Sequence, residues 1–219
     1  MSVLESFQCQ STFAQGISAV IHVVSPFFRS VDDPEKDLLD PARQGTVKVL
    51  EACLKHGVRR VIVTGSIAAV VDPTKVDTGN PLTYEQAVSS ALPGMAVYAV
   101  SKKIAEEAAF EFGREHPEIR ITVMNPTMIY GPLVLPADLS ALNTSSQDIY
   151  NLISGKLEET MSPVYADVRY VATLHVKALK VDENEASLFI SLPSFYRMFM
   201  CFLDGSPKGI YRRIFSGKD

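Results

Sequence analysis

The 219-residue sequence has no tryptophan, three cysteines and four histidines. Cys9, Cys53 and Cys201 lie far apart and form no CxxC pair, which argues against a disulfide framework or a zinc site and favours a reducing compartment. The histidines are equally scattered, so we expect no metal site. The sequence has no basic tract and its net charge is −4, which argues against a nucleic-acid partner.

Targeting signals and long hydrophobic runs are also missing. The opening stretch MSVLESFQCQ has no charged n-region and no long apolar run, so we expect no signal peptide. The apolar stretch at 195–203 contains Arg197 and is too short to span a bilayer. These features predict a cytoplasmic location.

Short β-branched segments alternate with helical periodicity in the first part of the chain. Strands are expected at 18–26, 59–66 and 117–127. A helix is expected at 40–57, where Asp40 caps the start, Pro41 suits the first turn and Gly57 supplies a left-handed stop. The next helix covers VYAVSKKIAEEAAFEF at 97–112, with Ala105, Ala108, Ala109 and Phe112 on its apolar face and Glu106, Glu107, Glu111 and Arg114 on its polar face. The order β-α-β-α-β predicts half of a doubly wound parallel sheet.

The remaining segments have weaker patterns. Residues 67–96 are predicted to be loop-rich. A short helix at 145–155 is expected to be capped by Ser145 or Ser146, and a longer one at 166–180 by Asp167. A strand is expected at 186–192. Residues 193–219 show no clear period and are predicted to be a poorly ordered end, with a membrane-surface helix as the alternative.

Tyr98 and Lys102 lie four residues apart, on one face of the helix that starts near residue 97. A free tyrosine has a pKa of about 10 and is a poor acid or base at neutral pH. A nearby ammonium stabilises the phenolate and lowers that pKa, so the pair is suited to giving a proton to a carbonyl oxygen or taking one from an alcohol. The alternative is an ordinary Tyr–Lys contact on a helix surface, because such spacing often arises by chance.

Two further segments end at the carboxyl edge of the predicted sheet, where ligands bind in such folds. Ser66 ends the strand VIVTGS, and its hydroxyl can hydrogen-bond a substrate carbonyl there. The segment NPTMIYGP at 125–132 leaves the third strand at the same edge, and its prolines free backbone groups that can meet a flat ring. The alternatives are a turn cap for Ser66 and a plain strand-ending turn for 125–132.

Taken in order along the chain, VTGS, YAVSK and NPTMIYGP resemble the extended short-chain dehydrogenase/reductase family of the NAD-dependent epimerase/dehydratase superfamily. The segments AVIHVVSP, DPARQGTVKVLEACLKHGVRRVIVTGS and YADVRYVATLHVKAL resemble further parts of that fold. The dihydroflavonol-reductase-like ketoreductase branch is the most similar one. The resemblance covers about residues 1–192.

The resemblance implies a Ser-Tyr-Lys triad and a nicotinamide cofactor, NADP or NAD. Tyr98 is then the acid–base group, Lys102 lowers its pKa and holds the nicotinamide ribose, and Ser66 orients the substrate carbonyl. The implied cofactor-binding residues are Val24, Ser25, Thr64, Tyr98, Lys102, Pro126, Thr127 and Ile129. The implied partner is a small carbonyl compound, with no membrane span and no nucleic acid.

The resemblance also implies a fold that this sequence matches only in part. The family opens with a glycine-rich G-x-x-G-x-x-G turn that grips the pyrophosphate, whereas Gly16 is the only glycine here before Gly45. We therefore expect a partial Rossmann-type doubly wound parallel sheet that lacks its first βαβαβ half and has a small C-terminal α/β substrate region. The expected division is a remnant dinucleotide-binding domain at 1–132, a partial substrate-binding region at 133–192 and a divergent tail at 193–219. The open sheet edge favours self-association.

Three functions follow from these features. The first is an NAD(P)-dependent oxidoreductase that reduces a ketone or oxidises an alcohol of a small, secondary-metabolite-like substrate. The second is a truncated, non-catalytic remnant or binding module, since the loss of charged hydrogen bonds to the pyrophosphate weakens cofactor binding. The third is a nucleotide-sugar epimerase or dehydratase, which uses the same triad. The sequence alone leaves the substrate, the hydride direction and the choice of NAD or NADP open.

Overall fold

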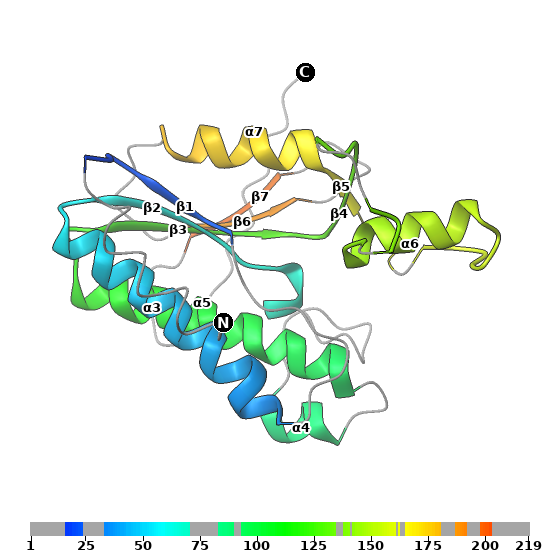
Figure 1. Cartoon of the computed structure of the whole chain (residues 1–219). Helices are drawn as coiled ribbons and strands as arrows, with labels where there is room; N and C mark the ends of the chain where they lie inside the picture. Colours follow the sequence, from blue (N-terminus) through cyan, green and yellow to red (C-terminus); the bar gives the residue numbers. More distant parts are fainter. Residues whose placement is uncertain are drawn as a thin grey trace.

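The structure is a computed structural model of the chain. It describes residues 16–23, 33–70, 83–89, 93–134, 138–140, 142–160, 162, 165–180, 187–191 and 198–202. Figure 1 shows a central sheet with helices on both of its faces. Within these ranges no helix is long and apolar enough to cross a membrane.

The main sheet contains β1 (Val20–His22), β2 (Arg60–Thr64), β3 (Arg120–Pro126), β6 (Ser187–Ser191) and β7 (Met198–Phe202), in the order β1-β2-β3-β6-β7. The first four strands are parallel to their neighbours, and β7 runs antiparallel to β6. This arrangement confirms the expected α/β fold with a parallel sheet. It also puts the carboxyl ends of β1, β2 and β3 at one edge, where the candidate site lies.

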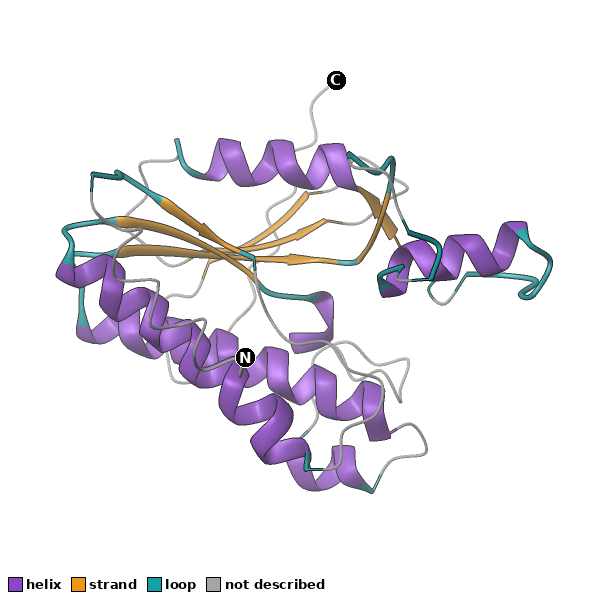
Figure 2. Ribbon diagram, viewed as in Figure 1, coloured by secondary structure: helices purple, strands orange, loops and turns teal. Residues whose placement is uncertain are grey.

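Three layers are visible in Figures 1 and 2, because helices cover both faces of the sheet. Helices α3 (Asp40–Lys55) and α5 (Pro93–Glu115) lie on one face, and α7 (Val168–Ala178) lies on the other. Helix α3 also packs along α5. The Tyr98–Lys102 pair therefore lies on a helix held by both the sheet and a neighbouring helix.

The alternation of side chains along β2 and β3 explains why both faces are covered. Successive residues of a strand point to opposite faces. Val61 and Val123 are buried in the large core cluster that α3 and α5 complete. Ile62 and Met124 are buried against Ala178 of α7 on the opposite face. Both strands are thus apolar on both sides, which is typical of a parallel sheet between helix layers.

Helix α3 begins differently from the prediction. A π-helical turn, η1 (Glu35–Leu39), runs directly into α3, so Asp40 is inside a continuous helical segment and does not cap it. The extra turn is stabilised because Leu38 and Leu39 are buried against α4 and α5. The predicted stop is confirmed, since Gly57 adopts a φ of 75° just after the helix.

The region predicted to be loop-rich, 67–96, contains helical structure. It includes the 3₁₀ turn η2 (Ile67–Ala69), the helix α4 (Tyr84–Val88) and the first residues of α5. A reciprocal capping box starts α4, because the Thr83 hydroxyl accepts from the Gln86 N–H while the Gln86 side chain accepts from the Thr83 N–H. This short polar motif was overlooked in the sequence.

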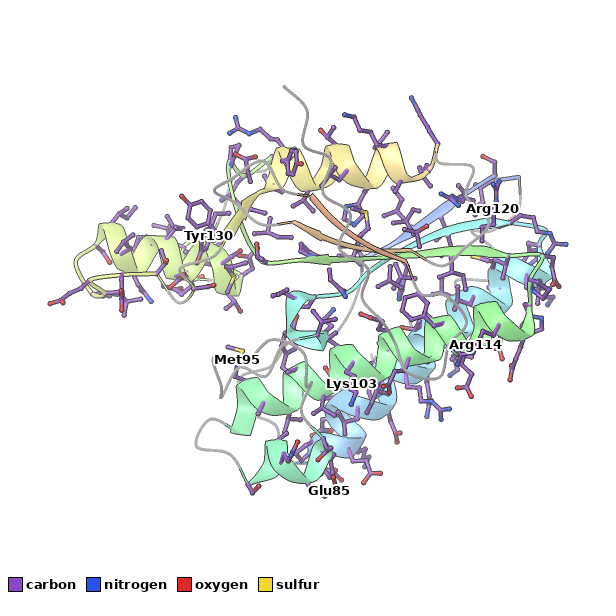
Figure 3. All side chains as sticks on the ribbon, turned by 180° about the vertical axis from the view of Figure 1, so that it is seen from behind. Glu85, Met95, Lys103, Arg114, Arg120 and Tyr130 are labelled. Atoms are coloured by element: carbon purple, nitrogen blue, oxygen red, sulfur yellow. The ribbon has the colours of Figure 1, made fainter. Side chains whose placement is uncertain are left out.

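The second, smaller sheet pairs β4 (Met128–Tyr130) with β5 (Tyr165–Asp167) in parallel. Helix α6 (Thr144–Ile153) projects away from the body beside it, and Tyr130 lies next to α6 (Figures 1 and 3). The Tyr130 hydroxyl donates to the buried Asp148 carboxylate, which fixes the helix to β4. The cap of α6 is Asn143, whose side chain accepts from the Ser146 N–H at 2.8 Å, so the prediction of Ser145 or Ser146 was wrong.

The C-terminal elements agree with the sequence in part. Helix α7 is capped by Asp167, whose side chain accepts from the Arg169 N–H, as predicted. Strand β6 matches the segment expected at 186–192. Strand β7 lies in the tail for which no periodicity was found, and it extends the main sheet at the β6 side. The proposed division of the chain at residues 132 and 192 stays a prediction.

Candidate active site

Tyr98 and Lys102 occupy consecutive turns on one face of α5, near the end of the helix that reaches the carboxyl edge of the sheet. The Lys102 ammonium nitrogen lies 5.7 Å from the centroid of the Tyr98 ring, within the range of a cation–π contact. The Lys102 side chain is only 6 % exposed, and Tyr98 is partly buried. The two residues therefore form a contact inside the protein and not a pair on the helix surface.

Ser66 joins this pair from the end of β2. It caps the 3₁₀ turn η2, and its side-chain oxygen accepts from the Ala68 N–H at 3.2 Å. Its hydroxyl also hydrogen-bonds the Tyr98 phenol. Both interpretations of Ser66 from the sequence thus apply, because it is a cap and it meets the tyrosine. The structure brings the three predicted catalytic residues together from β2 and α5.

The electrostatics of Tyr98 differ from the expectation. Burial raises the pKa of Tyr98 above its ordinary value of 10, and the hydrogen bond with Ser66 opposes this rise. The predicted lowering by Lys102 is not among the causes of the shift. A raised pKa keeps the phenol protonated at neutral pH, but it also makes the phenol of the cofactor-free chain a weaker acid than free tyrosine.

Lys102 carries its charge at a desolvated position. Burial lowers the pKa of Lys102 to about 8. Within the described ranges the ammonium has no hydrogen-bond acceptor, and it lies over the Tyr98 ring. Burial and the Lys102 charge together lower the pKa of His22, at the end of β1, to about 4. A buried ammonium that has no acceptor among the described residues can donate to a ligand.

The predicted cofactor-binding residues fall into three groups. Pro126 and Thr127 are buried at the carboxyl end of β3, and the Thr127 hydroxyl has no hydrogen-bond partner among the residues described. Ile129 is partly buried on β4, opposite Ala166 of β5. Val24 and Ser25 lie outside the described residues. Their roles at a cofactor stay predictions.

Thr64 lies apart from the other predicted cofactor-binding residues. Its side chain lies on the α7 face of the sheet, opposite to α5, and its hydroxyl is 2.8 Å from Nε2 of the buried His175. His175 Nδ1 lies 2.8 Å from the Val171 carbonyl oxygen and therefore donates to it, which leaves Nε2 to accept from Thr64. Thr64 thus connects the end of β2 to α7, and a role at the nicotinamide stays a prediction.

Several residues around the triad were missed by the sequence interpretation. Glu106 was placed on the polar face of its helix, but it lies one turn beyond Lys102 and hydrogen-bonds the buried Asn125 of β3. The four-residue steps from Tyr98 to Lys102 to Glu106 are visible in the sequence and could have revealed the shared face. His22 could have been found from its position in the strand that borders the site.

The arrangement fits the nicotinamide end of a dinucleotide. Lys102 offers ammonium donors, and Tyr98, which Ser66 hydrogen-bonds, offers a phenolic proton. Thr127, at the carboxyl end of β3, adds a buried hydroxyl that has no hydrogen-bond partner among the described residues. No group of three or more metal-ligating side chains occurs in the described part of the chain. The side chains brought together here are hydrogen-bond donors of the kind that can bind a hydroxylated ligand and donate a proton.

Comparison with known proteins shows the family of the chain. The profile of the NAD dependent epimerase/dehydratase family matches residues 1–185. The chain belongs to this family. This match confirms the resemblance that was stated from the sequence motifs.

Reductases are among the similar proteins. A cinnamoyl-CoA reductase of Medicago truncatula is 39 % identical over 169 residues, which are 75 % of this chain and 50 % of the relative. An NADPH-dependent methylglyoxal reductase of Saccharomyces cerevisiae is 34 % identical over 187 residues, 77 % of this chain and 54 % of the relative. The crystal structure of yeast methylglyoxal/isovaleraldehyde reductase Gre2 complexed with NADPH matches with a TM-score of 0.73 and 31 % identity, and it covers 91 % of this chain and 62 % of that one. The chain spans about half the length of the curated relatives it matches.

Proposed function

We propose that this chain carries the proton-donating and ribose-binding part of an NADP(H)-dependent oxidoreductase that reduces a small carbonyl compound. One observation carries the proposal: the buried Lys102 ammonium, which has no hydrogen-bond acceptor among the described residues, contacts a tyrosine that Ser66 hydrogen-bonds. The names of the relatives support the reaction class and the cofactor, since they describe NADPH-dependent and cinnamoyl-CoA reductases. The chain matches only about half of those relatives, so the activity of the whole protein is part of the proposal.

Each member of the triad has one task. The Ser66 hydroxyl hydrogen-bonds the substrate carbonyl and orients it beside Tyr98. The Tyr98 phenol, kept protonated by burial, donates its proton to the carbonyl oxygen as the oxygen gains negative charge. The Lys102 ammonium binds the ribose hydroxyls and stabilises the phenolate that remains. The reduced nicotinamide, when bound, supplies the hydride.

The choice of NADP over NAD follows from the NADPH-dependent relatives alone. An epimerase or dehydratase would use the same three residues and stays the alternative within the family. Reductases are among the relatives above 30 % identity, and this favours carbonyl reduction. A cytoplasmic location and self-association through the open sheet edge also stay predictions.

The test is the Tyr98→Phe variant, which removes only the phenolic hydroxyl. We measure oxidation of NADPH by the pure protein in the presence of small ketones and aldehydes. We expect Tyr98→Phe to lower kcat by about 10²–10⁴-fold, the usual value of a positioned acid. Tyr170→Phe, in which the same atom is removed from a half-exposed tyrosine of α7, serves as the matched control and should keep the wild-type rate.

Two outcomes would overturn the proposal. One is a reductase activity that Tyr98→Phe leaves unchanged, which would exclude the tyrosine as the acid. The other is a folded wild-type protein that reduces no carbonyl but interconverts nucleotide sugars, which would favour the epimerase alternative.

A further inference from the structure

A buried polar pair lies directly beside the triad. The Asn125 side chain on β3 is 0 % exposed, and its Nδ2 donates to the Glu106 Oε2 at 2.6 Å. Glu106 is partly buried on α5. Because the Asn125 amide nitrogen points to Glu106 in this contact, the amide oxygen is directed elsewhere. The Asn125 Oδ1 then faces away from Glu106 and has no partner among the described side chains and backbone.

The pair connects the helix that carries the triad to the sheet. Tyr98, Lys102 and Glu106 follow one another at four-residue steps and share one face of α5. Asn125 follows Val123 by two residues, so both side chains point to the α5 side of β3. The hydrogen bond therefore joins α5 to β3 one turn away from Lys102.

Asn125 also contacts the turn that carries Ser66. A Cβ atom added at Gly65 would lie 1.9 Å from the Asn125 Oδ1, so the amide occupies the space that a side chain at Gly65 would need. The Gly65 N–H donates to the Met124 carbonyl at 2.8 Å, which holds this turn against β3. Ser66 is the next residue. The Asn125 side chain thus lies between the Ser66 turn and Glu106.

We propose that Asn125 and Glu106 are positioning residues, and that their hydrogen bond, with the bare backbone of Gly65, sets the distance between the Ser66 turn and α5. The Ser66–Tyr98 hydrogen bond depends on that distance, because Ser66 lies on the turn and Tyr98 on the helix. The meaning of this pair for catalysis rests on the proposed function. Its effect on the Ser66–Tyr98 contact does not.

The burial of the Glu106 carboxyl supports its role as a positioning residue. It raises the pKa of the Glu106 carboxyl to about 7, the Asn125 amide opposes this rise, and the neighbouring Glu107 adds to it. A carboxyl kept at such a cost in the interior is held by its hydrogen bond. A leucine of similar volume at this position would remove the acceptor and leave the Asn125 N–H unpaired.

The experiment measures the pKa of the Tyr98 phenol in the cofactor-free chain by NMR with ring-labelled tyrosine, assigned by comparison with Tyr98→Phe. Ser66→Ala is the positive control, because loss of its hydroxyl removes the contact that lowers the Tyr98 pKa. We expect Glu106→Leu to raise the Tyr98 pKa by about 0.5–1, the value of one hydrogen bond. Glu106→Gln keeps an acceptor for Asn125 and should restore the wild-type value.

Glu107→Leu is the matched negative control, since it is the same substitution at the next, exposed position of α5. We expect it to leave the Tyr98 pKa unchanged. Circular dichroism and thermal unfolding of each variant show whether it is folded. If Glu106→Leu does not fold, Gly65→Ala decides, because the added methyl group must displace the Asn125 amide and should raise the Tyr98 pKa in the same direction.

The proposal would be overturned if folded Glu106→Leu had the Tyr98 pKa of the wild type. If Glu106→Leu does not fold, a wild-type Tyr98 pKa in folded Gly65→Ala would overturn it instead. The Glu106–Asn125 pair would then be a purely structural contact. These measurements need neither cofactor nor substrate, so failure of the proposed function would be seen separately, as absence of reductase activity. In a protein that is active, Glu106→Leu should lower kcat by about 10- to 100-fold with little change in KM, because the reacting groups are misplaced.

Discussion

At the scale of the residue, Lys102 is the group on which the site depends most. Its ammonium is buried, its pKa is lowered to about 8, and it lies over the Tyr98 ring. The described residues offer it no hydrogen-bond acceptor, and the hydroxyl groups of a ligand would provide one. The neutral His22 beside it offers no competing charge, since its own pKa is lowered to about 4.

Lys102 predicts how the site responds to pH. Above about pH 8 the ammonium loses its proton, and we expect affinity for NADPH to fall as pH rises through that value. The measurement is the dissociation constant of NADPH between neutral and alkaline pH, by fluorescence titration. Lys102→Met should abolish the pH step.

Lys103→Met is the control for this prediction, because Lys103 is the next residue of α5 (Figure 3) and pairs with Glu107 at 3.9 Å. It should retain the wild-type pH dependence. A step near pH 8 that survives in Lys102→Met would assign the titration to another group.

At the scale of the element, the end of β2 is held from both faces of the sheet. Ser66 connects it to α5, whereas Thr64 connects it to α7 through His175. His175 is buried, and both of its ring nitrogens are engaged. The position of the Ser66 turn therefore depends on α7 as well as on α5.

Thr64→Val tests this connection, because valine keeps the shape of threonine and removes the hydroxyl. The buried His175 Nε2 would lose its donor, and we expect the free energy of unfolding to fall by about 1–3 kcal/mol. Urea denaturation measures the loss. Thr173→Val, at an exposed position of α7, is the matched control and should change stability little. Equal effects of the two substitutions would show that the Thr64–His175 bond contributes nothing net.

Most elements of the main sheet could be predicted, because their signals are local. The strands around Val61 and Val123 are continuous β-branched runs, and helix α7 has a consistent apolar face with a clear cap at Asp167. The start of α3 could not, since Asp40 looks like a cap in the sequence while burial of Leu38 and Leu39 extends the helix before it. The cap of α6 was misassigned because three candidates, Asn143, Ser145 and Ser146, stand within four residues.

The proximity of Ser66, Tyr98 and Lys102 could be predicted because the motifs that contain them occur in a fixed order, but the surroundings of these residues could not. Glu106 belongs to a polar helix face by periodicity alone, and only the fold shows that Asn125 meets it from β3. Thr64 likewise follows Val63 in the strand, and the sequence gives no sign that its hydroxyl is directed to α7. Contacts between distant segments decide both cases.

At the scale of the whole molecule, buried titratable groups make stability depend on pH. The Glu106 pKa is about 7 in the folded protein against an ordinary value of 4.5. The folded state therefore binds more protons than the unfolded state between these values, and this group's contribution to stability is lost as pH rises from about 4.5 to about 7. His22 acts in the opposite direction, because its lowered pKa makes stability fall as pH drops from about 6.5 to about 4.

Glu106→Gln separates the two effects, since glutamine does not titrate. We expect the stability of the wild type, relative to Glu106→Gln, to fall by up to about 3 kcal/mol between pH 4.5 and 7. Urea unfolding across this range measures the difference. Glu107→Gln should show no such change relative to wild type. A flat difference for Glu106→Gln would mean that Glu106 titrates normally.

The central claim is that Ser66, Tyr98 and Lys102 form a site for a reduced nicotinamide ribose. The most direct measurement is a calorimetric titration of the folded chain with reduced nicotinamide mononucleotide, which carries only the end of the cofactor that these residues would hold, and with NADPH beside it. The account predicts binding that Lys102→Met weakens by about 10- to 100-fold, the value of charged hydrogen bonds, and that Lys103→Met leaves unchanged. Equal affinities of wild type and Lys102→Met, or no binding of either ligand by the folded chain, would contradict it.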